Sequence, residues 1–308
     1  MKQKVALVLS GGGARGIAHI GVIEELEKQG FEITSIAGTS MGALVGGIHA
    51  LGKLHSYKEW LCSLDKMSMF RLLDFSFTGQ GLIKGDKLFN KLAELITDGN
   101  IEDLKIPFAA VAADIVNKKE VVFTKGSVLD AVRASIAIPT IFTPVSTDDG
   151  LLVDGGVINN LPIEHVTRRQ GDILVVVNVN AAVPANEPTH SEQDPPTKKN
   201  IYLDKIHEFS SIFQKKKQNR REEKYGYFDV INKTISLINY NSCQLVLEKY
   251  TPDILVNVSH ECCATYDFYK GEEMIATGRN AALNSLEIYN SRSVKKSKST
   301  LIKRLFGY

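Results

Sequence analysis

The chain has 308 residues, of which 44% are hydrophobic and 23% are charged, and its formal net charge is only +2. Such a chain can bury a large core, and its near-neutral charge argues against general nucleic-acid binding, so no nucleic-acid partner is expected. The four cysteines lack the spacing of a disulfide framework or a zinc site: Cys62, Cys243, Cys262 and Cys263. We therefore expect a reduced, cytoplasmic location and no metal site.

The N-terminus carries Lys2 and Lys4, followed by an apolar run that stops at Ser10. This run is shorter than the hydrophobic region of a signal peptide and far shorter than a membrane span. No later segment is apolar for long enough to cross a bilayer. We expect neither a signal peptide nor a transmembrane helix.

Strand-like and helix-like segments alternate along the chain, which predicts an α/β fold with a mostly parallel sheet covered on both faces. Four apolar runs are typical of strands buried on both faces: Val5–Leu9, Ile33–Ala37, Phe108–Ala113 and Ile173–Val179. Glu120–Phe123 follows a polar turn and is expected to pair antiparallel with the strand before it. The turn Asp148-Asp149-Gly150 predicts a second hairpin that leads into Leu151–Val153.

The remaining segments differ in character. Residues 55–105 have a helical pattern with a glycine-rich connector (Gly79, Gly81, Gly85), which we expect to border the entrance of a binding site. Residues 181–226 form a polar and basic insertion in which 198–224 have the pattern of a basic amphipathic helix. A helix from Tyr227, a strand at Ile254–Val258 and a helix near Glu272–Tyr289 follow. We expect one domain over residues 1–290 and a basic C-terminal tail over 291–308.

The segment Gly11-Gly12-Gly13-Ala14-Arg15-Gly16 lies between the first predicted strand and a helix over Ile17–Gln29. Backbone N–H groups at such a junction can bind a developing negative charge. The segment also satisfies G-x-G-x-x-G, the dinucleotide-binding fingerprint, which expects an acidic residue at the end of the second strand. That strand ends in Ala37-Gly38-Thr39-Ser40 instead. A glycine turn that binds no ligand is the third interpretation.

The segment Gly38-Thr39-Ser40-Met41-Gly42 reads G-x-S-x-G between a predicted strand and a predicted helix over Met41–Leu51. This is the context of a nucleophile elbow, a sharp turn that exposes a serine hydroxyl while Gly38 and Gly42 leave room around it. A serine nucleophile beside an anion-binding loop indicates acyl transfer. Serine needs a base, and seven histidines are candidates, although none lies in a strand-end loop typical of a triad: His19, His49, His55, His165, His190, His207 and His260.

Taken together, these motifs resemble those of the patatin-like phospholipase family. The family has a glycine-rich oxyanion loop, a G-x-S-x-G elbow, an A-S-x-x-x-P block and a D-G-[GA] motif. The last two occur in this chain as Ala134-Ser135-Ile136-Ala137-Ile138-Pro139 and Asp154-Gly155-Gly156. The resemblance covers about residues 4–180 and, less closely, 226–289, and it is strongest to compact bacterial members. It implies a three-layer α/β/α fold with a mostly parallel central sheet.

The resemblance also implies a catalytic dyad of Ser40 and Asp154 in place of a triad. A free aspartate has a pKa near 3.9 and is a weak base at neutral pH, so the site would have to raise its basicity by burial. Gly155 and Gly156 would let backbone and substrate approach this carboxylate closely. Read alone, Asp-Gly-Gly is also a common turn after a strand.

The oxyanion donors implied by the resemblance are the N–H groups of Gly11, Gly12 and Gly13, with Arg15 close by. Arg15 could bind a substrate phosphate, brace the loop, or be a surface charge at a helix start. The N–H of Met41, directly after the serine, is a further candidate donor. Ser135 and Pro139 are expected to wall the site.

The function implied by the resemblance is hydrolysis of carboxylic ester bonds of lipids, without a metal or organic cofactor. A lipid transacylase with the same dyad and a non-catalytic lipid- or partner-binding protein are the alternatives. The expected partner is a lipid ester substrate. Peripheral contact with an anionic membrane surface through residues 198–224 and 291–308 is a further hypothesis, because both segments combine basic and apolar residues.

Overall fold

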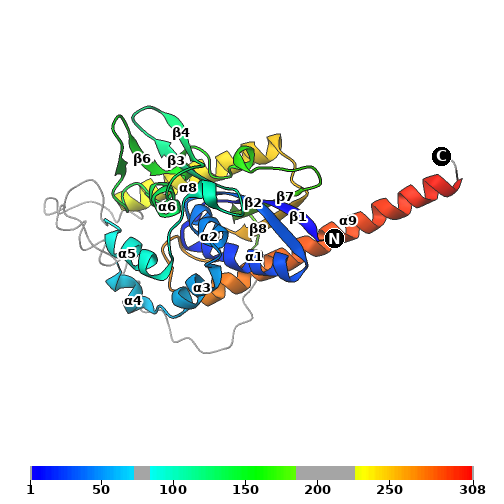
Figure 1. Ribbon diagram of the computed structural model, residues 1–308, viewed down its shortest axis with the longest axis horizontal. Helices are drawn as coiled ribbons and strands as arrows, with labels where there is room; N and C mark the ends of the chain where they lie inside the picture. The colour runs from blue at the N-terminus through cyan, green and yellow to red at the C-terminus, as the bar shows by residue number, and fades with distance from the viewer. Residues whose placement is uncertain (1, 73–83, 185–225, 307–308) are drawn as a thin grey trace, which may run out of the picture.

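The computed structural model describes residues 2–72, 84–184 and 226–306, which form an α/β structure around one sheet (Figure 1). The strands follow the order β5-β6-β3-β2-β1-β7-β8, with β4 paired to β3. Their bounds are β1 Gln3–Leu9, β2 Phe31–Thr39, β3 Phe108–Asp114, β4 Lys119–Phe123, β5 Val145–Ser146, β6 Leu151–Asp154, β7 Ile173–Ala181 and β8 Ile254–Ser259. The pairs among β3, β2, β1, β7 and β8 are parallel, whereas β4, β5 and β6 are joined by antiparallel pairs.

Helices cover both faces of this sheet. They are α1 Ala18–Lys28, α2 Met41–Ala50, α3 Leu54–Cys62, α4 Lys66–Arg71, α5 Asp86–Leu95, α6 Val128–Ser135, α8 Tyr227–Lys249 and α9 Gly271–Phe306, with short 3-10 turns η1 Gly13–Ile17, η2 Ile101–Asp103, η3 Gly155–Val157 and η4 Ile163–His165. Strand β1 shows why both faces are buried: Leu7 and Leu9 join the core under α1, α2 and α9, whereas Ala6 and Val8 join the core under α8. The predicted three-layer α/β/α architecture is confirmed.

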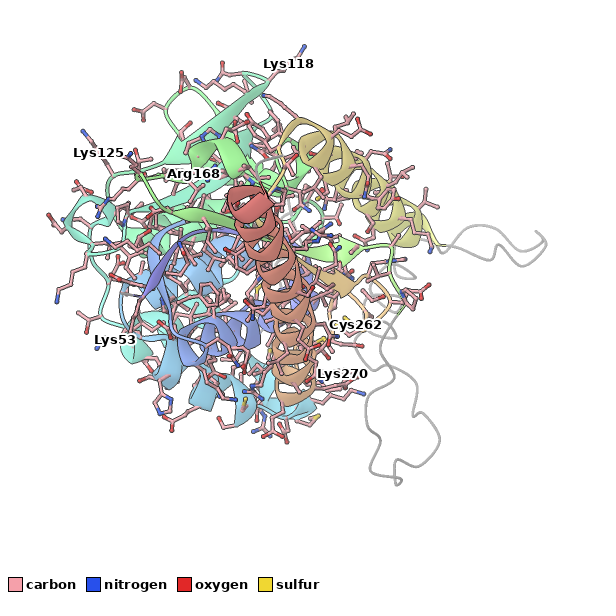
Figure 2. All side chains as sticks on the ribbon, turned by 90° about the vertical axis from the view of Figure 1, so that its right-hand side faces the viewer. Lys53, Lys118, Lys125, Arg168, Cys262 and Lys270 are labelled. Carbon is pink, nitrogen blue, oxygen red and sulfur yellow. The ribbon has the colours of Figure 1, made fainter. Side chains whose placement is uncertain are left out.

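Both predicted hairpins are present. Strand β4 pairs antiparallel with β3, and the turn between them is held by Asp114, whose carboxylate accepts the N–H groups of Val116 and Asn117. Lys118 has a positive φ of 54° in this turn, and its side chain projects from the molecule (Figure 2). Strands β5 and β6 form the second hairpin, closed by Thr147 N–H donating to Gly150 O at 3.1 Å. This hairpin delivers Asp154 to the middle of the molecule.

The last helix is longer than the sequence analysis predicts. The sequence predicts a helix near Glu272–Tyr289, but α9 continues to Phe306, and its C-terminal half extends away from the body of the protein (Figure 1). The reason is local: no glycine or proline occurs from Arg279 to Phe306, so nothing in the sequence ends the helix at Tyr289. The basic residues of segment 291–306 therefore lie on a helix that continues from the domain.

Some predicted features lie outside the described residues, namely the amphipathic segment 198–224 and the connector glycines Gly79 and Gly81. Gly85 is described: it precedes α5 with φ 84°, a left-handed conformation that favours glycine. Within residues 2–72, 84–184 and 226–306, no helix is both long and apolar enough to cross a membrane.

Candidate active site

Ser40 lies at the turn between β2 and α2 in a strained conformation, with φ 54° and ψ −125°. Two glycines make this turn possible. A Cβ on Gly42 would lie 2.2 Å from the carbonyl oxygen of Leu9, and a Cβ on Gly38 would lie 2.5 Å from the backbone of Gly42. Because α2 begins directly after Ser40 and packs this closely on β1 and β2, the turn has the geometry of a nucleophile elbow.

Strand β3 explains why Ser40 and Asp154 meet. Along one edge of β3, from Ala110 to Asp114, runs β4. The other edge is shared by two strands that approach each other end to end: β2 ends with Thr39 opposite Val111, and β6 ends with Asp154 opposite Ala112. The residues that follow β2 and close β6 are therefore neighbours, although they are far apart in sequence.

The two side chains are joined by a hydrogen bond in which Ser40 Oγ donates to Asp154 Oδ2 at 2.5 Å. The other carboxylate oxygen, Oδ1, accepts the N–H of Gly156 at 2.8 Å. Asp154 is buried, and this burial raises its pKa from 3.8 to about 6, although the hydrogen bonds from Ser40 and Gly156 act in the opposite direction. At neutral pH the carboxylate is ionised and is a stronger base than a solvated aspartate.

Ser135 holds the backbone of Ser40 in place, a role that the sequence analysis did not assign. Its hydroxyl accepts the Ser40 N–H at 2.8 Å and donates to Val111 O at 2.5 Å. It is fully buried at the end of α6, so it fastens the elbow to the centre of β3. The sequence analysis places Ser135 in the A-S-x-x-x-P block and expects it only to wall the site.

The glycine loop ends β1 directly beside Ser40. Gly11 donates its N–H to Asn160 O at 3.3 Å, and Ala14 donates to Thr265 O at 2.8 Å. Between them, the N–H groups of Gly12 and Gly13 have no hydrogen-bond partner among the described residues. Gly13 has φ 58°, and a Cβ there would lie 2.4 Å from Thr265 O. The loop therefore offers two unpaired donors in a conformation that favours glycine.

Arg15 is buried behind this loop, so the surface-charge interpretation is wrong. Its guanidinium donates to Val179 O at 3.2 Å and to Asn180 Oδ1 at 3.1 Å, and Asn180 Nδ2 in turn donates to Gly11 O at 2.6 Å. Burial lowers the pKa of Arg15, and no carboxylate within the described ranges pairs with it. The geometry fits bracing of the loop, and the uncompensated positive charge behind the loop favours negative charge in front of it.

No histidine contributes to this site in the part of the chain that the structure describes. No described histidine lines the pocket that contains Ser40 and Asp154. His19 is fully buried, its Nε2 contacts Ser10 O at 2.8 Å, and burial lowers its pKa to about 4. The others pair elsewhere: His49 with Glu27, His55 with Glu59, His165 with Glu120, and His260 with Ala181 O. His190 and His207 lie outside the described residues.

Two pockets meet at Ser40. The first, here called the polar pocket, contains the glycine loop, Arg15, Ser40, Asp154 and Asn160. Four residues of α8 also line it: Asn232, Ile235, Ser236 and Asn239. The second, here called the apolar pocket, starts at Ser40 and Met41 and is walled mainly by α2, α3, α5 and the segment after α6, through Leu44, Trp60, Leu88, Leu92, Ile141 and Phe142. Ile138 and Tyr266 line both pockets.

The sequence analysis missed the α8 contribution. Asn232, Ser236 and Asn239 are spaced i, i+4 and i+7, which puts them on one face of the helix. That polar stripe was readable in the sequence, but nothing in the sequence says that α8 lies against the elbow.

One group of described side chains has the composition of a cation site: Glu120, Glu164 and His165. These side chains contact one another and Asn159. His165 Nε2 lies 3.0 Å from Glu120 Oε1, and the amide of Asn159 donates to both carboxylates. None of the three lines the polar or the apolar pocket.

The chain is similar in sequence to known proteins. The sequence model of the patatin-like phospholipase family matches residues 7–167, just over half of the chain. An uncharacterized NTE family protein of Mycobacterium tuberculosis is 33% identical over 97% of this chain and 95% of its own length. Patatin-like phospholipase domain-containing protein 7 of Mus musculus is 33% identical over 58% of this chain, and lysophospholipase NTE1 of Kluyveromyces lactis is 31% identical over 58%; these matches span 14% and 13% of the two longer proteins. The chain belongs to the patatin-like phospholipase family.

Proposed function

We propose that this protein is a serine acyl hydrolase that cleaves carboxylic ester bonds of lipids, with Ser40 as nucleophile and Asp154 as general base. Membership of the family implies lipid acyl hydrolase activity. The observation that carries the residue assignment is the 2.5 Å hydrogen bond from Ser40 Oγ to Asp154 Oδ2 in a buried site. A direct contact of this kind removes the need for a histidine between nucleophile and carboxylate.

The reaction has two stages. Asp154 accepts the proton of Ser40 as Oγ attacks the ester carbonyl, and the protonated carboxyl then gives this proton to the departing alcohol oxygen. This leaves an acyl group esterified to Ser40. Water then attacks the carbonyl carbon of the acyl-enzyme, and Asp154 accepts a proton from this water. Asp154 returns the proton to Ser40 Oγ as the bond to the acyl group breaks, which releases the carboxylic acid and restores the serine hydroxyl. A pKa of about 6 suits both directions of transfer, since the carboxylate is ionised at rest and the acid is strong enough to donate.

The tetrahedral intermediate carries a negative charge that the glycine loop can stabilise. The unpaired N–H groups of Gly12 and Gly13 are the donors we assign, with the Met41 N–H as a further candidate. Gly11 contributes mainly to the shape of the loop, because its N–H already faces Asn160 O. Arg15 braces the loop through its bonds to Val179 O and Asn180 Oδ1 and adds positive charge at the wall of the polar pocket.

The apolar pocket supports a lipid substrate. It opens at Ser40, and its walls are side chains with little polar surface, so an acyl chain could lie there with its carbonyl carbon at Oγ. The polar pocket, which Ser40 also lines, then takes the alcohol part of the ester. A transacylase would use the same groups and replace water by an acceptor alcohol, and product analysis with an added alcohol distinguishes the two.

The test is labelling with a fluorophosphonate probe followed by mass mapping. We expect Ser40 to be the modified serine, and Ser40→Ala to remove both the label and the hydrolysis of p-nitrophenyl esters while the protein stays folded. Ser135→Ala is not a suitable control, because Ser135 holds the Ser40 N–H; Ser285→Ala, on α9, is. An alanine variant at Ser40 that keeps most of its turnover would overturn the assignment, and a folded wild type without label or turnover would favour the non-catalytic alternative.

A further inference from the structure

The polar pocket contains two buried amide oxygens that have no partner. Asn160 Oδ1 and Asn239 Oδ1 are shielded from solvent and accept no hydrogen bond from any described residue. Asn160 itself is fully buried, and its amide nitrogen is turned toward Cys243 Sγ at 3.4 Å. Buried acceptors are ordinarily paired, because an unpaired one loses its hydration without compensation. Two such oxygens side by side indicate a place that a donor group is meant to fill.

The two oxygens converge on one point next to the dyad. A Cβ built on Gly156 would lie 3.2 Å from Asn160 Oδ1, 3.2 Å from Asn239 Oδ1 and 3.0 Å from Asp154 Oδ1. The same Asn160 oxygen would lie 2.5 Å from a Cβ on Gly11, at the start of the glycine loop. The space therefore borders both the carboxylate and the loop, and glycine keeps it open on two sides. The polar atoms nearest to this space are hydrogen-bond acceptors, so a group that occupies it has to be a hydrogen-bond donor.

The side chains around this space limit which chemical groups fit it. Amide oxygens repel phosphate and carboxylate oxygens, so the pair does not fit an anionic group. The α8 residues add only neutral side chains, and Asn232 Oδ1 already accepts the hydroxyl of Tyr266 at 2.9 Å. Arg15 also lines the pocket, but its guanidinium already donates to Val179 O, Thr265 Oγ1 and Asn180 Oδ1. A neutral hydroxyl group fits, because it can donate to one amide oxygen while the carbon that carries it packs against glycine.

We propose that Asn160 and Asn239 form a subsite that accepts a hydroxyl group on the alcohol part of the ester, and so selects polyol esters that keep a free hydroxyl near the scissile bond. This inference rests on the proposed function, since it assigns the alcohol to the polar pocket. Asn239 is the specificity-determining residue of the pair that can be changed without altering the loop or the dyad, because it comes from α8 and neither Ser40 nor Asp154 bonds to it. A hydrophobic side chain at this position leaves the substrate hydroxyl without its acceptor.

The experiment compares two esters with one carbon skeleton, propyl octanoate and 2,3-dihydroxypropyl octanoate. We expect the wild type to prefer the dihydroxy ester in kcat/KM by about 10-fold or more, as a hydrogen-bonding site does against an analogue that lacks the group. In Asn239→Leu this preference should fall toward unity through loss of kcat/KM on the dihydroxy ester. Asn241→Leu makes the same chemical change at an exposed position of α8 and should keep the wild-type preference.

Four results separate the possibilities. Equal use of both esters by the wild type, or an unchanged preference in a folded Asn239→Leu protein, overturns the subsite. An equal fall in kcat on both esters would assign the two amide oxygens to the water of the second stage instead, and would also overturn it. If neither ester is cleaved and Ser40 is not labelled, the proposed function itself has failed. Should Asn239→Leu lose its helical circular dichroism, Asn239→Ala, which adds no bulk, is measured in its place.

Discussion

The two pockets that meet at Ser40 differ in what their walls can do. The polar pocket holds an ionisable carboxylate, unpaired backbone N–H groups and amide side chains, whereas the apolar pocket holds hydrocarbon side chains and almost nothing that can hydrogen-bond. Stabilising the charges that develop during the reaction requires polar groups, and binding a fatty chain requires an apolar surface. In the proposed function, the reacting atoms and the alcohol part of the ester lie in the polar pocket, and the acyl chain lies in the apolar pocket. Substitutions on the two sides should therefore produce different kinetic defects.

The largest loss of activity is expected in the polar pocket, on substitution of Asp154, the proposed general base. Asp154→Asn is nearly isosteric but cannot accept the Ser40 proton, so kcat for p-nitrophenyl esters should fall by about 10³-fold or more. Histidine-to-glutamine changes at all seven positions should each retain most of the activity in folded protein. A histidine variant as inactive as Asp154→Asn would show that a triad operates.

The same substitution should make the protein more stable. Burial raises the pKa of Asp154 from 3.8 to about 6, so ionising it in the folded state costs up to about 3 kcal/mol at neutral pH. Stability should fall as pH rises from about 4 to about 6 and then level off, because the folded state holds the proton that the unfolded state has released. Asp154→Asn should remove this fall and raise the melting temperature at pH 7. Urea denaturation at pH 4, 5, 6 and 7 measures it, and an Asn variant less stable than wild type at pH 7 contradicts it.

The pH dependence of the rate should follow from the same group. Below a pH of about 6, Asp154 is increasingly protonated in the free enzyme, and kcat/KM should fall about tenfold per pH unit. Above that pH the profile should be flat until another group titrates. Labelling of Ser40 by the fluorophosphonate should show the same midpoint, since it needs the same base. A midpoint near 4 would mean that Asp154 is hydrated in solution.

In the apolar pocket, a substitution is expected to change the selectivity for acyl-chain length. Leu88→Trp places a large ring in the wall of the apolar pocket, so the ratio of kcat/KM for p-nitrophenyl decanoate to that for p-nitrophenyl acetate should fall by about 10-fold. Asn90→Trp adds the same ring at an exposed position of α5 and should leave the ratio unchanged. An unaltered ratio in Leu88→Trp would mean that the acyl chain lies elsewhere.

The fold and the central residues of the polar side could be predicted from sequence because their signals are local. The glycine loop, the elbow and the hairpin before Asp154 are each specified by a few consecutive residues, whereas the role of Asp154 is implied only by the resemblance to the family. Other parts depend on which segments meet in space. Ser135 reaches the Ser40 N–H only because α6 ends beside β3, and Asn160 and Asn239 face each other only because α8 lies over the segment after η3. The length of α9 differs for another reason: the sequence analysis predicts a tail from the basic run at 291–308, although its residues are compatible with helix.

The smallest expected effect concerns how the lipid reaches either pocket. Six basic residues lie in segment 291–308: Arg292, Lys295, Lys296, Lys298, Lys303 and Arg304. Each contributes about 1 kcal/mol near an anionic membrane at moderate salt, so their sum favours adsorption even if only some approach the surface.

Deletion of 291–308 should not disturb the domain, because α9 crosses α1 much earlier, where a Cβ on Gly278 would lie 1.9 Å from Ala18 O. We expect the truncated protein to bind vesicles of anionic phospholipid several-fold more weakly than the full chain, with the difference larger at low salt, and to hydrolyse p-nitrophenyl acetate at the same rate. Uncharged phosphatidylcholine vesicles are the control and should show little difference between the two proteins. Equal binding of both proteins to anionic vesicles at low salt would remove this segment from membrane contact and leave 198–224 as the remaining basic candidate.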